Sequence, residues 1–140
     1  FIYASEHAVF AQSEVKLGII PGAMGTQNLP RAVGLARAKE LCFTGDAFSA
    51  AQALEWGLVN QIVKSDNLID AVLITANKIA QNAPIAIQAA KEVINQSWAR
   101  DVVAGYQLEV ASYNQVLNTK DRKEGIAAFN TKSQPLFKGE

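Results

Sequence analysis

The hydrophobic pattern of the first part of the chain indicates short strands separated by breaks. Apolar runs at residues 1–4 and 8–11 are typical of strands, and the segment Pro-Gly-Ala-Met-Gly-Thr at 21–26 interrupts the pattern as a loop does. A further apolar run at 58–63 predicts another strand. The first part of the chain is therefore expected to contain a small set of strands.

Two helices are expected between the loop and the last strand. Pro30 suits the first position of a helix that runs to about Phe43, because proline has no N–H to leave unpaired there. Ser49 and Gln52 have the spacing of a capping box, and Gly57 stands where a left-handed residue would end a short helix. The predicted order is strand, loop, helix, helix, strand.

Beyond residue 63, apolar positions recur at the three- and four-residue steps of helices. One such helix is expected before Pro84, a second begins at Pro84, a third is capped by Asp101, and a fourth spans about 120–130. The third helix carries the longest apolar stripe, which consists of Val103, Tyr106, Val110, Tyr113 and Leu117. These helices offer more apolar surface than so short a chain can bury, so self-association is expected.

Composition narrows the possible functions. Thirteen lysines and arginines balance thirteen aspartates and glutamates, which argues against binding to nucleic acid or to an anionic membrane. No apolar stretch approaches the roughly 20 residues that span a bilayer. Cys42 is the one cysteine, expected as a buried thiol, so no disulfide framework exists and a reducing compartment is expected. The chain opens on an apolar strand-like run at Phe1, from which we expect it to be a fragment of a longer protein.

Few side chains offer acid–base chemistry. His7 is the only histidine and is expected at the surface, and there is no Cys/His cluster, paired aspartate or nucleophile elbow. The 21–26 loop lacks the lysine of a phosphate-binding loop, although it could bring backbone N–H groups close to a ligand. Glu14 stands between a strand and this loop. Its position alone predicts a solvated surface charge.

The run from Phe10 to Arg31 resembles the signature of the crotonase superfamily. That signature has a Phe, a Pro-Glu or similar pair, Leu-Gly, then Pro-Gly-Ala-Gly-Gly-Thr-Gln and an arginine. The similarity continues through Gly57-Leu58-Val59-Asn60 and the stretch from Asp121 to Phe129, and it covers nearly the whole chain. Within the superfamily the chain is most similar to enoyl-CoA hydratases and methylglutaconyl-CoA hydratases.

The resemblance implies an α/β fold class. Residues 1–63 would form the C-terminal part of a crotonase-like ββα spiral, and residues 64–140 would form a helical oligomerisation region used for trimer assembly. It also implies that Glu14 transfers a proton at the substrate α-carbon and that the backbone of Gly22 helps to place the catalytic water. The residues that it places at the substrate are Pro21, Met24, Tyr113, Phe129 and Lys132.

Three of these assignments compete with simpler interpretations, and two positions depart from the family pattern. Tyr113 and Phe129 have the spacing of helix-packing residues, and Lys132 could be a solvated charge. Met24 stands where the family usually has glycine, which would place a bulky side chain beside the loop, and Ser13 stands where proline is common.

The implied reaction is hydration of a 2-enoyl-CoA, with CoA as part of the substrate and with no metal or redox cofactor. Hydratases of this family use a second glutamate and two oxyanion-hole N–H groups that lie upstream of Phe1, so the isolated chain is expected to have little activity. The implied assembly is a homotrimer or hexamer, in the cytoplasm of a bacterium or the mitochondrial matrix of a eukaryote. Enoyl-CoA isomerisation, which one carboxylate can support, and a non-catalytic CoA-binding or oligomerisation module remain as alternatives.

Overall fold

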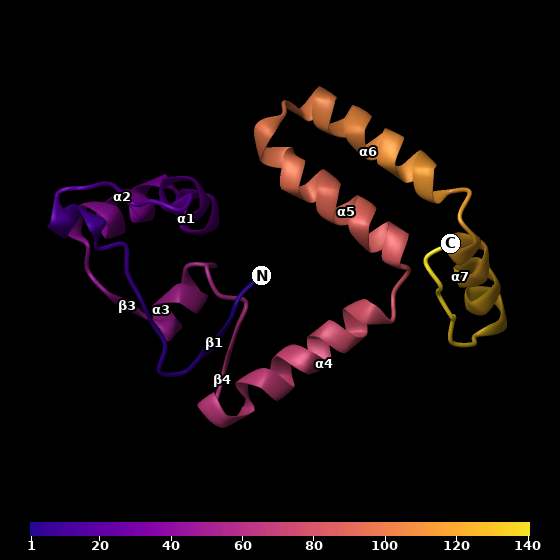
Figure 1. Cartoon of the computed structure of the whole chain (residues 1–140), viewed down its shortest axis with the longest axis horizontal. Coiled ribbons are helices and arrows are strands. Elements are labelled where there is room, and N and C mark those ends of the chain that lie inside the picture. The colour runs from indigo at the N-terminus through magenta and orange to yellow at the C-terminus, as the bar shows by residue number, and fades with distance from the viewer. The chain divides into compact units, whose positions relative to one another are not determined.

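The computed structural model describes residues 1–140, and the chain divides into two units, Phe1–Leu73 and Ile74–Glu140. Figure 1 labels their helices in chain order. The division falls within α4 (Leu68–Ala80), whereas the boundary expected from the sequence follows β4 (Gln61–Val63). That earlier boundary, which separates a catalytic from an assembly region, stays a prediction.

The strands of the first unit form two separate pairs. β1 (Tyr3–Ser5) runs parallel to β4, with Ala4 opposite Ile62, and β2 (Val9–Phe10) runs antiparallel to β3 (Phe48–Ser49). The strands expected at the beginning of the chain and before residue 63 are present, although each is shorter than its apolar run.

The prediction of one helix beginning at Pro30 is wrong. The helix α1 (Gly25–Val33) starts five positions earlier and contains Pro30, and α2 (Leu35–Thr44) is separate from it. Gly34 adopts φ 81° and ψ 158°, a conformation that only glycine reaches without strain, and this residue interrupts the helical path. The predicted stop after α2 is confirmed, because Gly45 is left-handed at φ 63°.

The capping box of α3 (Ala50–Glu55) is confirmed. The Gln52 N–H donates to Ser49 Oγ at 3.3 Å, and the Ser49 N–H donates to Gln52 Oε1 at 2.9 Å. Each side chain thereby satisfies a backbone group that the helix leaves free. Gly57 follows at φ 82°, as the sequence predicted.

The core of the first unit lies where α1, α2 and α3 meet the paired strands. Phe48 stacks on Phe10 with ring centroids 5.6 Å apart, and Trp56 packs against Phe48 at 5.3 Å. The Arg37 guanidinium covers Trp56 from outside at 4.3 Å. The buried apolar residues are Ala4, Leu29, Ala38, Leu41, Phe48, Ala50, Ala53 and Val59.

The second unit consists of helices, as predicted. α5 (Pro84–Gln96) and α6 (Val102–Val116) lie side by side in Figure 1, and α7 (Lys120–Thr131) follows them. Pro84 begins α5, and Asp101 caps α6 by accepting a hydrogen bond from the Ala104 N–H at 2.9 Å. Three short 3-10 turns complete the elements of the whole chain. η1 (Glu14–Leu17) and η2 (Ser65–Asn67) belong to the first unit, and η3 (Ser97–Ala99) belongs to the second.

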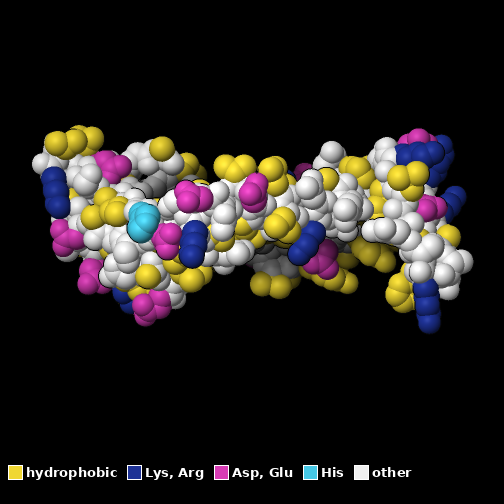
Figure 2. All heavy atoms as spheres, turned by 90° about the horizontal axis from the view of Figure 1, so that it is seen from below, with side chains coloured by type: hydrophobic (Ala, Val, Ile, Leu, Met, Phe, Trp, Pro, Cys, Tyr) yellow, Lys and Arg dark blue, Asp and Glu magenta, His cyan; other side chains and the backbone are white.

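Much apolar surface is exposed in both units. The predicted stripe of α6 is largely open to solvent, with Val103 68%, Tyr106 64% and Tyr113 62% exposed. Figure 2 shows apolar side chains spread over the visible face. No helix has the length and apolar composition needed to cross a membrane.

Candidate functional site

Glu14 is the first residue of η1 and is half-buried. Its Oε2 atom is buried and has no hydrogen-bond partner in the chain. A buried acceptor without a donor costs about 1–3 kcal/mol, so such an atom usually marks a place where another donor binds. The simple interpretation of Glu14 as a solvated charge is therefore disfavoured by its surroundings.

A close contact with Gly45 holds the turn that carries Glu14. A Cβ atom at Gly45 would lie 3.3 Å from the backbone Cα of Ser13 and 3.0 Å from Cε of Lys16. Gly45 also needs its left-handed φ to end α2, so a glycine is required there for two reasons. The residues on either side of Glu14 are thus packed directly against the end of α2.

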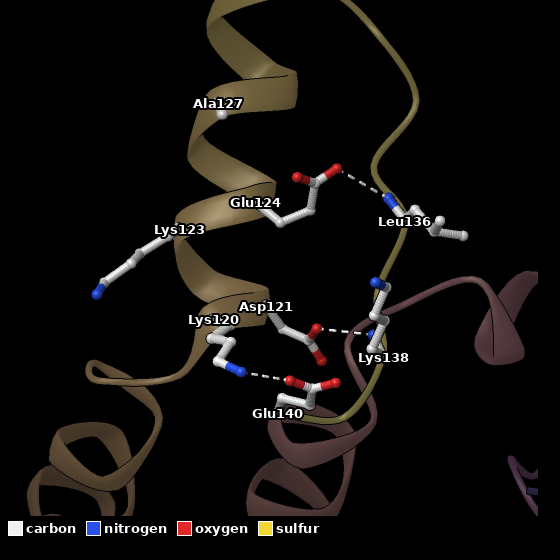
Figure 3. Close-up of a pocket in the computed structure, with 8 residues that line it drawn as sticks. All are labelled: Lys120, Asp121, Lys123, Glu124, Ala127, Leu136, Lys138 and Glu140. Carbon is white, nitrogen blue, oxygen red and sulfur yellow. Dashed lines mark hydrogen bonds and ion pairs between the residues drawn. The ribbon is translucent and has the colours of Figure 1, made fainter.

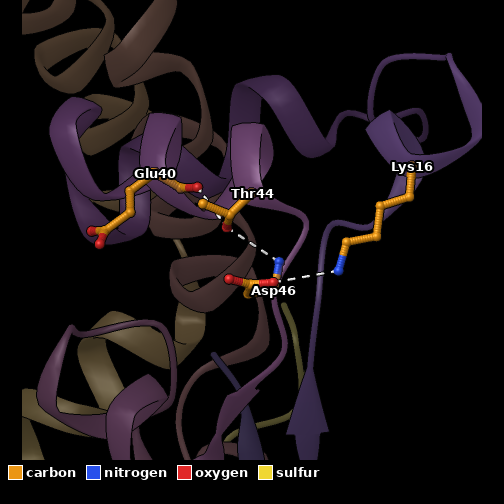
Figure 4. A network of polar contacts seen from close by, with 4 residues as sticks. All are labelled: Lys16, Glu40, Thr44 and Asp46. Carbon is orange, nitrogen blue, oxygen red and sulfur yellow. Dashed lines mark hydrogen bonds and ion pairs between the residues drawn. The ribbon is translucent and has the colours of Figure 1, made fainter.

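Lys16 points toward Asp46, just after the end of α2, as Figure 4 shows. Its ammonium lies 3.4 Å from Asp46 Oδ1, and the Asp46 N–H donates to Thr44 Oγ1 at 3.2 Å. Thr44 in turn donates to the Glu40 carbonyl at 2.9 Å. Because Lys16 is engaged by Asp46, the Glu14 carboxyl keeps no neighbouring cation as its partner.

The loop after η1 presents unpaired backbone donors. Pro21 is buried, Gly22 is exposed, and the next two residues, Ala23 and Met24, are left-handed at φ 46° and 66°. No backbone hydrogen bond outside the helices and strands uses the N–H of Gly22, Ala23 or Met24. Two consecutive left-handed residues without glycine are costly, and such strain concentrates at functional sites.

Gln12 lies close to Gly25 at the start of α1, and the sequence alone did not single it out. Its Oε1 atom is buried without a partner, as Oε2 of Glu14 is. A Cβ atom at Gly25 would lie only 2.8 Å from this oxygen and 3.1 Å from Cβ of Pro21. The glycine at the start of α1 therefore makes room for Gln12. The sequence signal that could have identified Gln12 was its position two residues before Glu14.

The thiol of Cys42, on α2, interacts electrostatically with Glu14. Burial raises the pKa of the Cys42 thiol above its ordinary value, and the negative charge of Glu14 raises it further. The sequence predicted a buried thiol, whereas the structure leaves Cys42 half-buried. The turn with Glu14 and the middle of α2, which are far apart in sequence, are thus close enough to interact electrostatically.

The other predicted substrate residues belong to the second unit. Tyr113 lines a groove of about 430 Å³ between α5 and α6 that is almost entirely apolar. Phe129 is 84% exposed on α7, and Lys132, which ends that helix, is left-handed at φ 53°. In the first unit, Gly25 lies close to Gln12 and Pro21. No group of three or more His, Cys, Asp or Glu side chains is placed to hold a metal ion.

Comparison with known proteins gives one consistent likeness. The sequence matches the family described as Enoyl-CoA hydratase/isomerase over residues 1–140. It is 42% identical over 139 residues to a mitochondrial enoyl-CoA hydratase of Pongo abelii, covering 99% of this chain and 48% of that protein. It is 46% identical over 126 residues to a short-chain-enoyl-CoA hydratase of Clostridioides difficile, covering 90% of this chain and 81% of that protein.

The structure resembles a crystal structure of an enoyl-CoA hydratase from Bacillus anthracis, with a TM-score of 0.96 and 46% identity. The match covers 99% of this chain and 54% of that one, so the chain spans about half the length of the solved relative. The predicted fold class, a crotonase-type α/β fold followed by helices, is confirmed by this likeness.

Proposed function

Because the chain belongs to the enoyl-CoA hydratase/isomerase family, we propose that it supplies catalytic and substrate-binding residues for the addition of water to the double bond of a 2-enoyl-CoA thioester. The product is a 3-hydroxyacyl-CoA, with oxygen added at the β-carbon and hydrogen at the α-carbon. The relatives compared above are named as hydratases. The chain spans about half of two of them, so the activity is a proposal for the protein.

The observation that carries the proposal is the buried, unpartnered Oε2 of Glu14, in the turn that precedes a loop of free backbone N–H groups. In the proposed mechanism water attacks the β-carbon and gives one proton to a general base, the role of the second glutamate that hydratases of the family use, while the Glu14 carboxyl donates a proton to the α-carbon. A carboxyl group that has one oxygen buried and forms no ion pair can present this proton directly to a substrate.

Gly22 is assigned to the placement of the water. Its N–H has no backbone acceptor in the chain, and the loop leads into the first turn of α1. The N-terminal end of a helix carries partial positive charge, which favours an oxygen that gains negative charge during attack. A Cβ at Gly22 would meet nothing within 4 Å, so the backbone group is open to a small molecule.

The remaining proposed contacts are apolar or cationic. Pro21 is buried beside the loop, whereas Met24 is 61% exposed and can line the acyl group. In the second unit, Tyr113 and Phe129 offer aromatic surface, and Lys132 offers a cation for the CoA moiety. The proposal includes no metal or redox cofactor, and CoA is part of the substrate.

The proposal includes assembly into a homotrimer or hexamer through the helical part of the chain. Support comes from the exposed stripe of α6 and from Phe129, which leave large apolar side chains in water. The proposed location is the cytoplasm of a bacterium or the mitochondrial matrix of a eukaryote. Relatives come from both kinds of source.

The proposed function is tested by hydration of crotonyl-CoA, followed as loss of the conjugated thioester absorbance. The assay uses the purified chain and also an exchange chimera, in which this chain replaces the matching 54% of the Bacillus anthracis hydratase. Glu14→Gln in the chimera should lower kcat by roughly 10²–10⁴-fold, as expected on loss of an acid–base group. The control is Glu40→Gln, which removes the same charge from an exposed position on α2.

A Glu14→Gln chimera that hydrates crotonyl-CoA as fast as the parent chimera would contradict the proposal.

A second candidate function is double-bond isomerisation of an enoyl-CoA. It is favoured by one observation: Glu14 is the only carboxylate of the chain with a buried, unpartnered oxygen, and an isomerase needs one such group. Conversion of a 3-enoyl-CoA by the isolated chain, without hydration of the 2-enoyl isomer, would support that candidate.

A further inference from the structure

The loop that contains Gly22 closes as a tight turn on the first residue of α1. The Gly25 N–H donates to the Gly22 carbonyl at 2.7 Å, and the two residues between them, Ala23 and Met24, are left-handed at φ 46° and 66°. Turns with two left-handed residues are dominated by glycine, asparagine and aspartate, because the Cβ atom of other residues is crowded in this conformation. The turn is therefore strained and keeps its shape only while its surroundings hold it.

The side chains of Gln12 and Pro21 pack closely around Gly25. The position that a Cβ atom would take at Gly25 lies 2.8 Å from Gln12 Oε1, 3.3 Å from Gln12 Cδ and 3.1 Å from Pro21 Cβ. The φ angle of Gly25 is not left-handed, so these contacts, and not the backbone conformation, leave no room for a side chain. Because glycine has no side chain to anchor it, its neighbours fix its place.

Packing, and not a hydrogen bond, keeps the Gln12 amide against Gly25. Gln12 is half-buried between two exposed residues, Ala11 and Ser13, so its side chain alone is directed inward in this extended stretch. Its Oε1 atom is buried and accepts no hydrogen bond from the chain. The contribution of Gln12 within the chain is thus the volume that it places beside Gly25.

Gly25 in turn contacts the chain on both sides of the Gly22 Cα. On one side it binds the Gly22 carbonyl, and on the other it packs against Pro21, whose peptide bond carries the Gly22 N–H. A displacement of Gly25 would therefore change the direction of the Gly22 N–H group. That group is the one to which the placement of the water is assigned.

We propose that Gln12 is a positioning residue for the water that adds to the substrate, because its side chain holds Gly25 and thereby fixes the strained turn at Gly22. The inference rests on the proposed function, which assigns the water to Gly22. Gln12 itself touches no reacting atom. With the Gln12 side chain removed, Gly25 loses one of its two close neighbours, and the turn relaxes away from the geometry that aims the Gly22 N–H.

Three variants separate the volume of Gln12 from its amide group. Gln12→Ala removes the volume beside Gly25, whereas Gln12→Met keeps a side chain of similar length without the amide oxygen. Gln61→Ala is the matched control, because it removes an exposed glutamine from β4 of the same unit. Gln12→Ala should release the turn, and the other two variants should leave it in place.

Amide hydrogen exchange of the full chain measures release of the turn without any substrate. In Gln12→Ala, exchange at the Gly25 N–H should accelerate roughly tenfold, because its bond to the Gly22 carbonyl opens more often. Gln12→Met and Gln61→Ala should leave this exchange unchanged. Exchange in α3 should not change in any variant, which shows that the chain remains folded. Unchanged exchange at Gly25 in Gln12→Ala would overturn the proposal.

A double-mutant cycle tests the contact between Gln12 and Gly25 in the full chain. Gly25→Ala should lower the urea midpoint of unfolding, because the new Cβ atom would meet Gln12 Oε1 at 2.8 Å. In a Gln12→Ala background the same substitution should lower the midpoint much less, because the space is open. Equal reductions in the two backgrounds would show that the two residues do not hold each other.

Two reactions of the exchange chimera separate water placement from proton transfer. Hydration of crotonyl-CoA needs both, whereas exchange of the α-hydrogens of butyryl-CoA with D₂O needs only the proton transfer assigned to Glu14. Gln12→Ala should lower kcat for hydration by roughly 10- to 100-fold, the effect of a small misplacement, with KM and the rate of α-hydrogen exchange unchanged. Gln12→Met and Gln61→Ala should retain both reactions.

Three results of these reactions would overturn the proposal. Hydration by Gln12→Ala at the rate of the parent chimera would show that Gln12 positions nothing. Equal losses of hydration and α-hydrogen exchange would show that the substitution acts on Glu14 instead of Gly22. Loss of hydration in Gln12→Met as large as in Gln12→Ala would show that the amide oxygen, and not the volume, is what matters.

A failure of the proposed function would be seen before any of these substitutions is made. A parent chimera that does not hydrate crotonyl-CoA would contradict the assignment of the water to Gly22. Failure of the present inference requires a parent chimera that is active, so the two failures are distinguishable.

Discussion

Replacing Gly45 with alanine tests how the turn with Glu14 is held. Gly45 is left-handed at φ 63°, and an alanine there costs about 1–2 kcal/mol of backbone strain. Its Cβ would also lie 3.3 Å from the Ser13 Cα, which is tighter than ordinary contact. Moving the backbone of η1 by a few tenths of an ångström adds about 1 kcal/mol, the lower end of the cost of overpacking.

Gly18 supplies the matched control for this substitution. It is also left-handed, at φ 76°, but a Cβ there would meet nothing within 4 Å. Gly18→Ala therefore carries the backbone strain of about 1–2 kcal/mol alone. The difference between the two variants, about 1 kcal/mol, isolates the contact between the end of α2 and the turn.

Urea unfolding followed by the fluorescence of Trp56 measures this difference in the first unit. The second tryptophan, Trp98, is replaced by phenylalanine in every variant so that Trp56, which packs against Phe48, is the only reporter. Gly45→Ala should be less stable than Gly18→Ala and should also lower crotonyl-CoA hydration by the exchange chimera, because Glu14 moves with Ser13. Equal losses of stability and activity in the two variants would refute the reasoning.

Two further predictions concern local contacts. Ser49→Ala should destabilise the first unit by about 1 kcal/mol by removing the cap of α3, whereas Ser13→Ala should cost less because Ser13 makes no side-chain cap bond; urea unfolding distinguishes them. Because burial and Glu14 raise the pKa of Cys42, its alkylation by iodoacetamide at pH 9 should be slower than that of a free thiol. Glu14→Gln should accelerate the alkylation and Glu40→Gln should not; the opposite order would contradict the assigned cause. Because the folded chain raises the pKa of the Cys42 thiol, the unfolded chain loses this proton first, and the free energy of unfolding should fall as the pH rises past the ordinary thiol pKa.

Local signals in the sequence predicted much of the fold. The Ser49 and Gln52 capping box, the left-handed Gly57, Pro84 at the start of α5 and the Asp101 cap each depend on residues only a few positions apart. The first residue of α1 and the break between α1 and α2 could not be predicted from such local signals. A glycine such as Gly34 can either continue a helix at moderate cost or interrupt it, and tertiary packing decides between these outcomes.

The surroundings of the candidate site depend on contacts between residues that are far apart in the sequence. Position alone predicted Glu14 as a surface charge, and the resemblance to a family singled it out. The residues Ser13 and Lys16 near it lie close to Gly45, and its charge raises the pKa of Cys42, which is far from it in the sequence. Asp121 lies within the stretch that carried the resemblance, but its hydrogen bonds with the backbone N–H groups of Lys138, drawn in Figure 3, and of Gly139 could not be predicted from it. Its partner Lys138 is 17 positions away in an extended segment without a periodic pattern.

The most direct test of the central claim is exchange of the α-hydrogens of butyryl-CoA with D₂O, followed by proton NMR. Butyryl-CoA has no double bond to hydrate, so exchange isolates the proton transfer assigned to Glu14. The exchange chimera should lose the α-hydrogen signals, the Glu40→Gln control should do so at the same rate, and Glu14→Gln should slow the loss by roughly 10²–10⁴-fold. Exchange in Glu14→Gln at the rate of the parent chimera would contradict the assignment of Glu14 as the residue that transfers the proton.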